Sequence, residues 1–149
     1  MKSRLQMVDQ IKKREMLLCI ASTVALISGC HSRSHAKLGF DSININKTGG
    51  MYDIEGEIGL GVTGEWTPFR NVSAVGLNED GTVICRQPIG EVDSEYVGGG
   101  KSVSLACDQY PRIITYEIER DPCSSGIEVN KMVYDEERDL WVEEPIECE

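Results

Sequence analysis

The chain has 149 residues, with 15 Lys and Arg against 25 Asp and Glu, and a formal net charge of −10 at pH 7. Residues 1–29 contain five basic and two acidic residues, so residues 30–149 keep 10 basic and 23 acidic residues and a net charge of −13. A surface this acidic argues against binding to nucleic acid or to anionic lipid headgroups, and it favours cationic partners.

An apolar segment without charged residues, Met16 to Gly29, follows the short basic leader. As a helix its 14 residues extend about 21 Å, which is less than the ~30 Å hydrocarbon core of a bilayer. Its length, together with the positive charges that precede it, therefore predicts a secretory signal peptide rather than a permanent membrane span.

Ile27-Ser28-Gly29-Cys30 ends this segment and resembles the lipobox of prokaryotic lipoprotein signal peptides. In that family the cysteine thiol takes a diacylglyceryl group, and cleavage leaves the cysteine as the first residue of the mature chain. The resemblance implies a signal peptide at residues 1–29, lipidation of Cys30, and a protein held on the extracytoplasmic face of the cell membrane. The alternative is a retained N-terminal helix in which the cysteine is incidental. The acidic, lysine-poor composition of residues 30–149 is also similar to that of secreted haloarchaeal proteins.

The predicted signal peptide assigns different roles to the six cysteines. Cys19 lies inside it and Cys30 would carry the lipid, which leaves four for an oxidising compartment. Of the three possible pairings we favour the one in which each pair flanks a turn signal, namely Cys85–Cys107 and Cys123–Cys148. Zinc binding by these four residues is the competing interpretation, but no C-x₂-C spacing is present and no histidine follows His35.

Residues 30–37 predict a lipidated cysteine followed by a short polar tether, ahead of a folded domain at residues 38–149. The tether contains His31 and His35. Two histidines in one segment can capture a metal ion, but we expect both to be solvated.

The remainder of the chain shows the period-two alternation of half-buried strands. It is clearest in residues 52–62, where apolar side chains occupy even positions and acidic side chains stand between them. A mobile loop is predicted at residues 87–101, which contain Pro88 and three consecutive glycines, and this loop is the candidate for a partner-facing surface at a loop end of the fold. Trp66 to Phe69 forms a corner that we expect to place aromatic rings on the core. Further strands are predicted at residues 38–47, 71–77, 82–85, 102–107, 112–119, 129–134 and 140–142.

About eight short strands with no helix after the signal predict an all-β fold, a β-sandwich of seven or eight strands. The pattern resembles the immunoglobulin-like domains common in prokaryotic lipoproteins, over about residues 38–148. It departs from that family at Cys85 and Cys107, which are too close in sequence to be expected as the pair that joins the two sheets.

No catalytic set is recognisable, because residues 38–149 contain no histidine base for a serine or cysteine nucleophile. We therefore predict a non-catalytic, lipid-anchored module without a cofactor that binds an unknown protein or small molecule. An exported hydrolase using acidic residues is one alternative, although 23 carboxylates make any chosen pair uninformative. Calcium-dependent binding is the other, with oxygen ligands crowded in two turns: Asn78 and Asp80, and Asp135, Glu136, Glu137 and Asp139.

Overall fold

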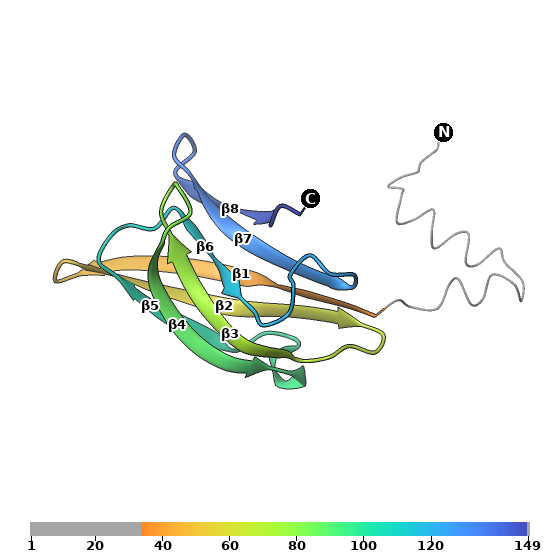
Figure 1. The fold of residues 1–149 in the computed structure, drawn as a ribbon. Coiled ribbons are helices and arrows are strands. Elements are labelled where there is room, and N and C mark those ends of the chain that lie inside the picture. The colour runs from red at the N-terminus through yellow and green to blue at the C-terminus, as the bar shows by residue number, and fades with distance from the viewer. Residues whose placement is uncertain (1–33, 149) are drawn as a thin grey trace, which may run out of the picture. The chain divides into compact units, whose positions relative to one another are not determined.

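The computed structural model describes residues 34–148, which form an all-β domain of eight strands (Figure 1). The predicted signal peptide, Cys19, Cys30 and His31 lie outside the described residues. A short 3₁₀ helix, η1 (Ser94–Tyr96), is inserted after the fourth strand. Within residues 34–148, no helix is long and apolar enough to cross a membrane. The strands are β1 (His35–Thr48), β2 (Met51–Thr63), β3 (Phe69–Leu77), β4 (Val83–Val92), β5 (Ser102–Cys107), β6 (Ile113–Glu117), β7 (Ile127–Asp135) and β8 (Leu140–Pro145).

The hydrogen-bonded order of the strands is β4-β3-β6-β7-β1-β2-β5, and β8 pairs with the outer edge of β7. β7 is the junction between two halves of the sheet. Its first residues, 127–129, pair in parallel with β1, whereas residues 132 and 133 pair antiparallel with β6. The sheet therefore curls around a shared core and becomes nearly barrel-shaped, with β4 and β5 as the two ends of the order (Figure 1).

The core confirms the alternation predicted for β2. Ile54, Ile58 and Leu60 are at most 6% exposed. Gly56, which interrupts this apolar row, makes room for an aromatic ring, since a Cβ there would lie 2.9 Å from the Phe40 ring. That ring stacks on Tyr116 at 4.4 Å between centroids, so the glycine allows an aromatic pair to cross the centre of the core.

A buried disulfide joins the two end strands of the sheet. Cys85 of β4 bonds to Cys107 of β5, and both residues belong to the hydrophobic core. The expectation that this pair could not join the two halves of the sheet is wrong. A separation of 22 residues suffices because η1 and its flanking turns carry the chain from one half to the other. Gly76 of β3 leaves the space, since a Cβ there would lie 2.5 Å from the Cys85 sulfur.

The second disulfide, Cys123–Cys148, links the β6–β7 connection to the residues after β8, so both pairs are those favoured from the sequence. Two boundaries differ from the prediction. The predicted loop at residues 87–101 is wrong for residues 87–92, because β4 continues to Val92. Pro88 is tolerated inside β4 because an end strand needs no second set of hydrogen bonds. β1 begins at His35 rather than after the tether, because Ala36 is buried and its N–H donates to the Gly126 carbonyl at 2.8 Å.

Replacing Cys85 and Cys107 together with alanine is expected to lower the free energy of unfolding by about 3 kcal/mol through chain entropy alone. The loss of buried sulfur contacts should add to this cost. The Cys123→Ala/Cys148→Ala variant is the matched control, since its pair closes a loop of 25 residues rather than 22. Urea unfolding should show the larger loss in the first variant; equal losses would contradict a packing role for the first disulfide.

Candidate binding surfaces at the two ends of the domain

The strands run lengthwise and collect the connections at two ends of the domain (Figure 1). We call the end where β1 starts the near end; it also carries the connections at residues 64–68 and 118–126. The far end carries the turns at residues 48–51, 78–82, 108–112 and 135–139. β1 runs between the two ends, and its 14 residues span about 45 Å at roughly 3.3 Å per residue.

Four aromatic side chains meet at the far end and are called the aromatic cluster: Tyr52, Tyr110, Tyr134 and Trp141. Tyr110 is central, with its ring centroid 5.3 Å from that of Tyr52, 5.6 Å from that of Tyr134 and 6.4 Å from that of Trp141. Tyr134 and Trp141 also contact each other, at 5.5 Å. The cluster therefore joins residues of β2, the β5–β6 connection, β7 and β8 into one surface.

The far end is also where apolar side chains reach solvent. The described residues include five large hydrophobic side chains that are exposed, and four of them lie here: Met51 (39%), Val83 (37%), Tyr110 (38%) and Leu140 (43%). We call these four residues and the aromatic cluster the far-end surface. Exposed apolar groups that gather in one place, rather than scatter singly, are typical of interaction sites.

Arg112 holds the far-end surface together. Its N–H donates to the Leu77 carbonyl at 2.8 Å, and its own carbonyl accepts from the Tyr134 N–H at 3.0 Å. The guanidinium lies 5.7 Å from the centre of the Tyr134 ring and forms an ion pair with Glu136. At the other side of the cluster, the Lys47 ammonium lies 5.5 Å from the centre of the Tyr52 ring. Two rings thus already accept cations from within the chain.

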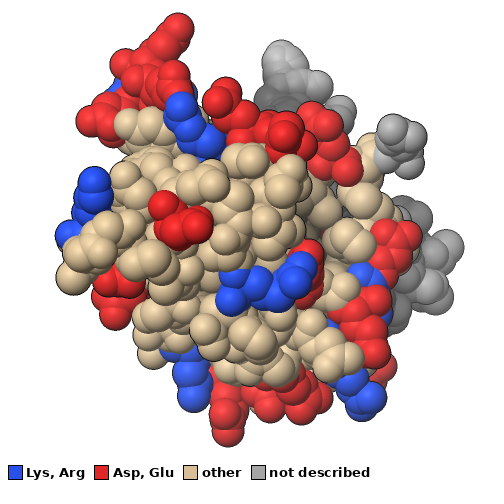
Figure 2. Space-filling model, turned by 60° about the vertical axis from the view of Figure 1, so that its left-hand side comes forward, with Lys and Arg blue, Asp and Glu red and all other residues tan. Residues whose placement is uncertain are grey.

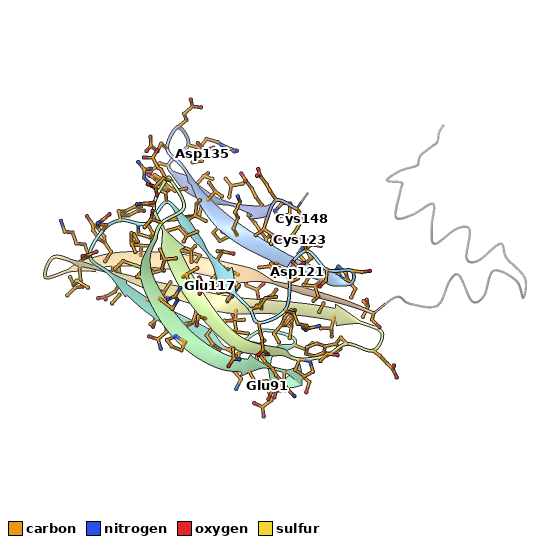
Figure 3. All side chains as sticks on the ribbon, in the orientation of Figure 1. Glu91, Glu117, Asp121, Cys123, Asp135 and Cys148 are labelled. Carbon is orange, nitrogen blue, oxygen red and sulfur yellow. A yellow bond between two sulfur atoms is a disulfide. The ribbon has the colours of Figure 1, made fainter. Side chains whose placement is uncertain are left out.

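Acidic side chains surround this surface. Figure 2, turned so that this side of the domain comes forward, shows most of them along the upper, right and lower margins of the face, with a basic group near its centre. Figure 3 places Asp135 in the β7–β8 turn, at the tip of this end. The Asp135 carboxylate accepts from the Glu137 N–H and from Arg138, and the hydrogen bond from Arg138 lowers the pKa of Asp135 below its usual range. Its neighbour Asp139 accepts a hydrogen bond from Tyr134, which raises the pKa of that phenol to about 12.

The second turn proposed to bind calcium, at residues 78–82, is also held by hydrogen bonds to its own side chains. The Asn78 side chain accepts from the N–H groups of Asp80 and Thr82. The Thr82 hydroxyl donates to Asp80 at 2.6 Å and lowers the pKa of that carboxyl group. The side chains of Asn78, Asp80 and Asp135 thus shape their own turns, and within residues 34–148 no three His, Cys, Asp or Glu side chains are grouped to hold a metal ion.

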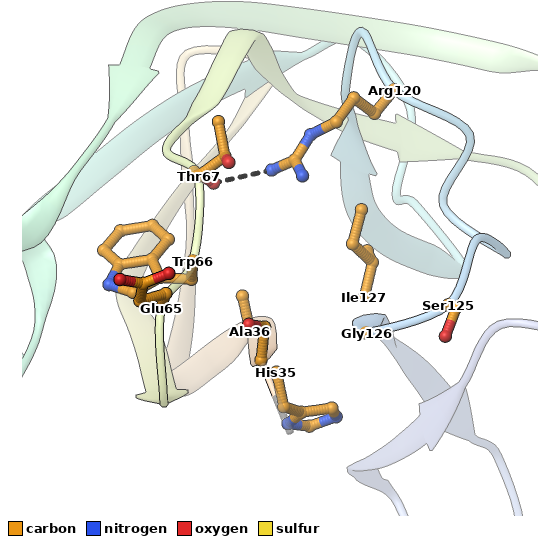
Figure 4. Close-up of a pocket in the computed structure, with 10 residues that line it drawn as sticks. His35, Ala36, Glu65, Trp66, Thr67, Arg120, Ser125, Gly126 and Ile127 are labelled. Carbon is orange, nitrogen blue, oxygen red and sulfur yellow. Dashed lines mark hydrogen bonds between the residues drawn. The ribbon is translucent and has the colours of Figure 1, made fainter. Parts of the chain in front are cut away.

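The near end contains a cleft of about 710 Å³ (Figure 4). Arg120 crosses it and donates to the Thr67 carbonyl at 2.7 Å, while its guanidinium lies 4.9 Å from the centre of the Phe69 ring. Trp66 lies 6.5 Å from the buried Phe69 ring, so this corner places aromatic rings on the core as predicted. The cleft is lined by Ser34, His35, Ala36, Glu65, Trp66, Thr67, Arg120, Ser125, Gly126 and Ile127.

No protein-family model, curated protein or solved structure matches this chain.

The structure agrees with the predicted role of the cysteines but places His35 differently from the prediction. All four domain cysteines form disulfides, and His35, predicted to be a solvated tether residue, lies in a strand with its Nε2 3.7 Å from a Glu128 carboxylate oxygen. The partner-facing surface was expected at residues 87–101, which lie in β4, η1 and the connection to β5, and neither the near-end cleft nor the far-end surface was identified from the sequence. One signal was present for the latter: each member of the aromatic cluster stands beside a turn at the far end.

The Asp135→Asn substitution is expected to make stability less sensitive to acid. Because the pKa of Asp135 is lowered in the folded chain, the unfolded chain binds the proton more tightly. The stabilisation is therefore present above the ordinary value of 3.8 and is lost as the pH falls through the lowered pKa. The difference in Tm between wild type and variant should shrink from about pH 6 to about pH 2.

Glu137→Gln is the control, because it removes a charge from the same turn where the described residues offer its carboxylate no hydrogen bond or ion pair. A difference that does not change with pH, or one that Glu137→Gln reproduces, would show that the Asp135 charge does not stabilise the turn.

Proposed function

We propose that this protein is a lipid-anchored, non-catalytic binding protein on the extracytoplasmic face of the cell membrane. Cys30 carries the lipid, and the far-end surface engages the partner. The observation that carries the proposal is that the exposed apolar side chains gather at the end of the domain opposite Ser34. Cys30 precedes Ser34 by four residues, which span at most about 14 Å. An anchor there leaves the far end, some 45 Å along β1, turned away from the lipid.

The chemistry of the domain supports an extracytoplasmic location. Two disulfides account for all four cysteines between residues 34 and 148. Such bonds persist in oxidising compartments and are rare in reducing ones. A net charge of −13 on residues 30–149 also keeps the domain from lying flat on an anionic lipid surface.

The domain is, in this proposal, an immunoglobulin-like β-sandwich. The strand order supports this assignment, since β1-β2-β5 corresponds to the A-B-E sheet of that fold and β4-β3-β6-β7 to the C′-C-F-G sheet. β8 is then an additional strand at the outer edge of β7. Cys85–Cys107 would join C′ to E, in place of the B–F disulfide of antibody domains.

The rival functions have less support in the described part of the chain. Calcium-dependent binding requires free oxygen ligands, whereas the carboxylates of Asp80, Asp135 and Asp139 accept hydrogen bonds from their own turns. Hydrolysis by acidic residues requires two carboxylates facing each other across a cleft. The near-end cleft is lined by one, Glu65, whereas a smaller cleft of about 420 Å³ is lined by Asp41 and Glu143, so this cleft is where a hydrolase alternative would have to act.

The Cys30→Ser substitution tests the anchor. Without a thiol the lipid cannot be attached, so the protein should leave the membrane fraction or retain its signal peptide and migrate as a larger species. Cell fractionation and gel mobility measure both effects, with Cys19→Ser as the matched control that removes a thiol within the signal. Unchanged membrane association and mobility in Cys30→Ser would refute lipid anchoring.

The two tryptophans test the orientation, because Trp66 lines the near-end cleft and Trp141 lies on the far-end surface. In vesicles containing a lipid with a nitroxide-labelled headgroup, we expect quenching of Trp66 in the Trp141→Phe variant. Trp141 in the Trp66→Phe variant should be quenched much less. Equal quenching, or the reverse order, would contradict the proposed orientation.

A further inference from the structure

We infer that the far-end surface binds a cationic polypeptide segment, whose Lys or Arg side chains stack on the aromatic cluster and pair with the carboxylates around it. This inference rests on the proposed function and names the class of partner for the same surface. Three observations carry it: rings that reach solvent, cations already seated on two of them, and the balance of charge in the surrounding turns.

The rings supply the recognition chemistry. Tyr110 is 38% exposed at the centre of the cluster and contacts Trp141, and within the described residues no cation lies over either ring. The outer rings, Tyr52 and Tyr134, are already paired with Lys47 and Arg112. An aromatic face attracts ammonium and guanidinium groups through its quadrupole, most strongly where water is excluded. The rings of Tyr110 and Trp141 can therefore bind a cation from a partner, as Tyr52 and Tyr134 bind cations of the chain itself.

The net charge of the far end favours a partner of positive charge. Its four turns contain seven carboxylates and two arginines, a net charge of −5. Both arginines are already engaged, Arg112 with Glu136 and Arg138 with Asp135. Complementary charge steers association and rejects partners of the same sign. A cationic segment can both stack on the rings and form ion pairs with the carboxylates of the turns. A neutral polysaccharide could stack on the rings but could form no ion pairs.

The test uses the full chain with the Trp66→Phe substitution, so that Trp141 is the single fluorescent reporter on the surface. It is titrated with a synthetic peptide of alternating lysine and glycine. The same peptide with glutamate in place of lysine, and a soluble neutral polysaccharide, are the comparison ligands. We expect only the lysine peptide to change Trp141 emission, and its affinity should fall as salt is added.

Matched variants locate the binding. In the same background, Tyr110→Ser should weaken the lysine peptide about tenfold, while Tyr110→Phe keeps the ring and the affinity. Tyr96→Ser, in η1 and outside the far-end surface, removes a ring of the same type and should have no effect. The double variant Glu79→Gln/Glu137→Gln should weaken binding on the order of threefold to tenfold, and Glu65→Gln/Glu91→Gln, with the same change in net charge, should not.

Equal losses in the two charge variants would overturn the inference, because the peptide would then respond to net charge alone. A response to the polysaccharide but not to the lysine peptide would overturn it in favour of a carbohydrate partner. Both outcomes leave the proposed function in place. Failure of that function appears separately, as Cys30→Ser protein that remains in the membrane fraction with unchanged mobility.

Discussion

The structure depends most on the disulfide between Cys85 and Cys107. A twisted sheet that does not close leaves two end strands with unpaired backbone groups, and such edges are sites of aggregation. Here β4 and β5 are those ends, and a covalent bond holds them together beside the core. The bond requires Gly76, since any Cβ at that position would enter the space of the sulfur atoms.

This disulfide also determines the geometry of the far end. Val83 lies two residues before Cys85, and Tyr110 lies three residues after Cys107. Pro111, which follows Tyr110, is fully buried beside the same glycine. Two parts of the far-end surface that come from opposite halves of the sheet are thus fixed to one buried bond. Ion pairs with an exposed partner, such as Arg112–Glu136, contribute little to stability, so packing, the backbone hydrogen bonds of Arg112 and this disulfide provide the rigidity of the surface.

The sequence predicted the features that depend on neighbours along the chain. Alternation identified β2, and turn signals between the cysteines identified both disulfides. Prediction from the sequence failed for features that depend on contacts between residues far apart in the chain. β1 begins at His35 because Gly126, some 90 residues later, accepts a hydrogen bond from Ala36. The aromatic cluster could not be derived from local pattern, since Tyr52, Tyr110 and Trp141 meet only after the sheet has curled.

The direction of the strands explains why both ends of the described chain, residues 34 and 148, lie away from the far end. Eight strands alternate between the two ends, so the chain enters β1 and leaves β8 at the same end. Cys123–Cys148 reinforces this arrangement by bonding the chain after β8 to the near-end connection at residues 118–126. Among residues 34–148, the far end is therefore composed of the turns that connect the strands, and neither end of this part of the chain lies there. Aromatic and apolar side chains on those turns are exposed in the described part of the chain, which is the physical condition for the binding surface that we propose there.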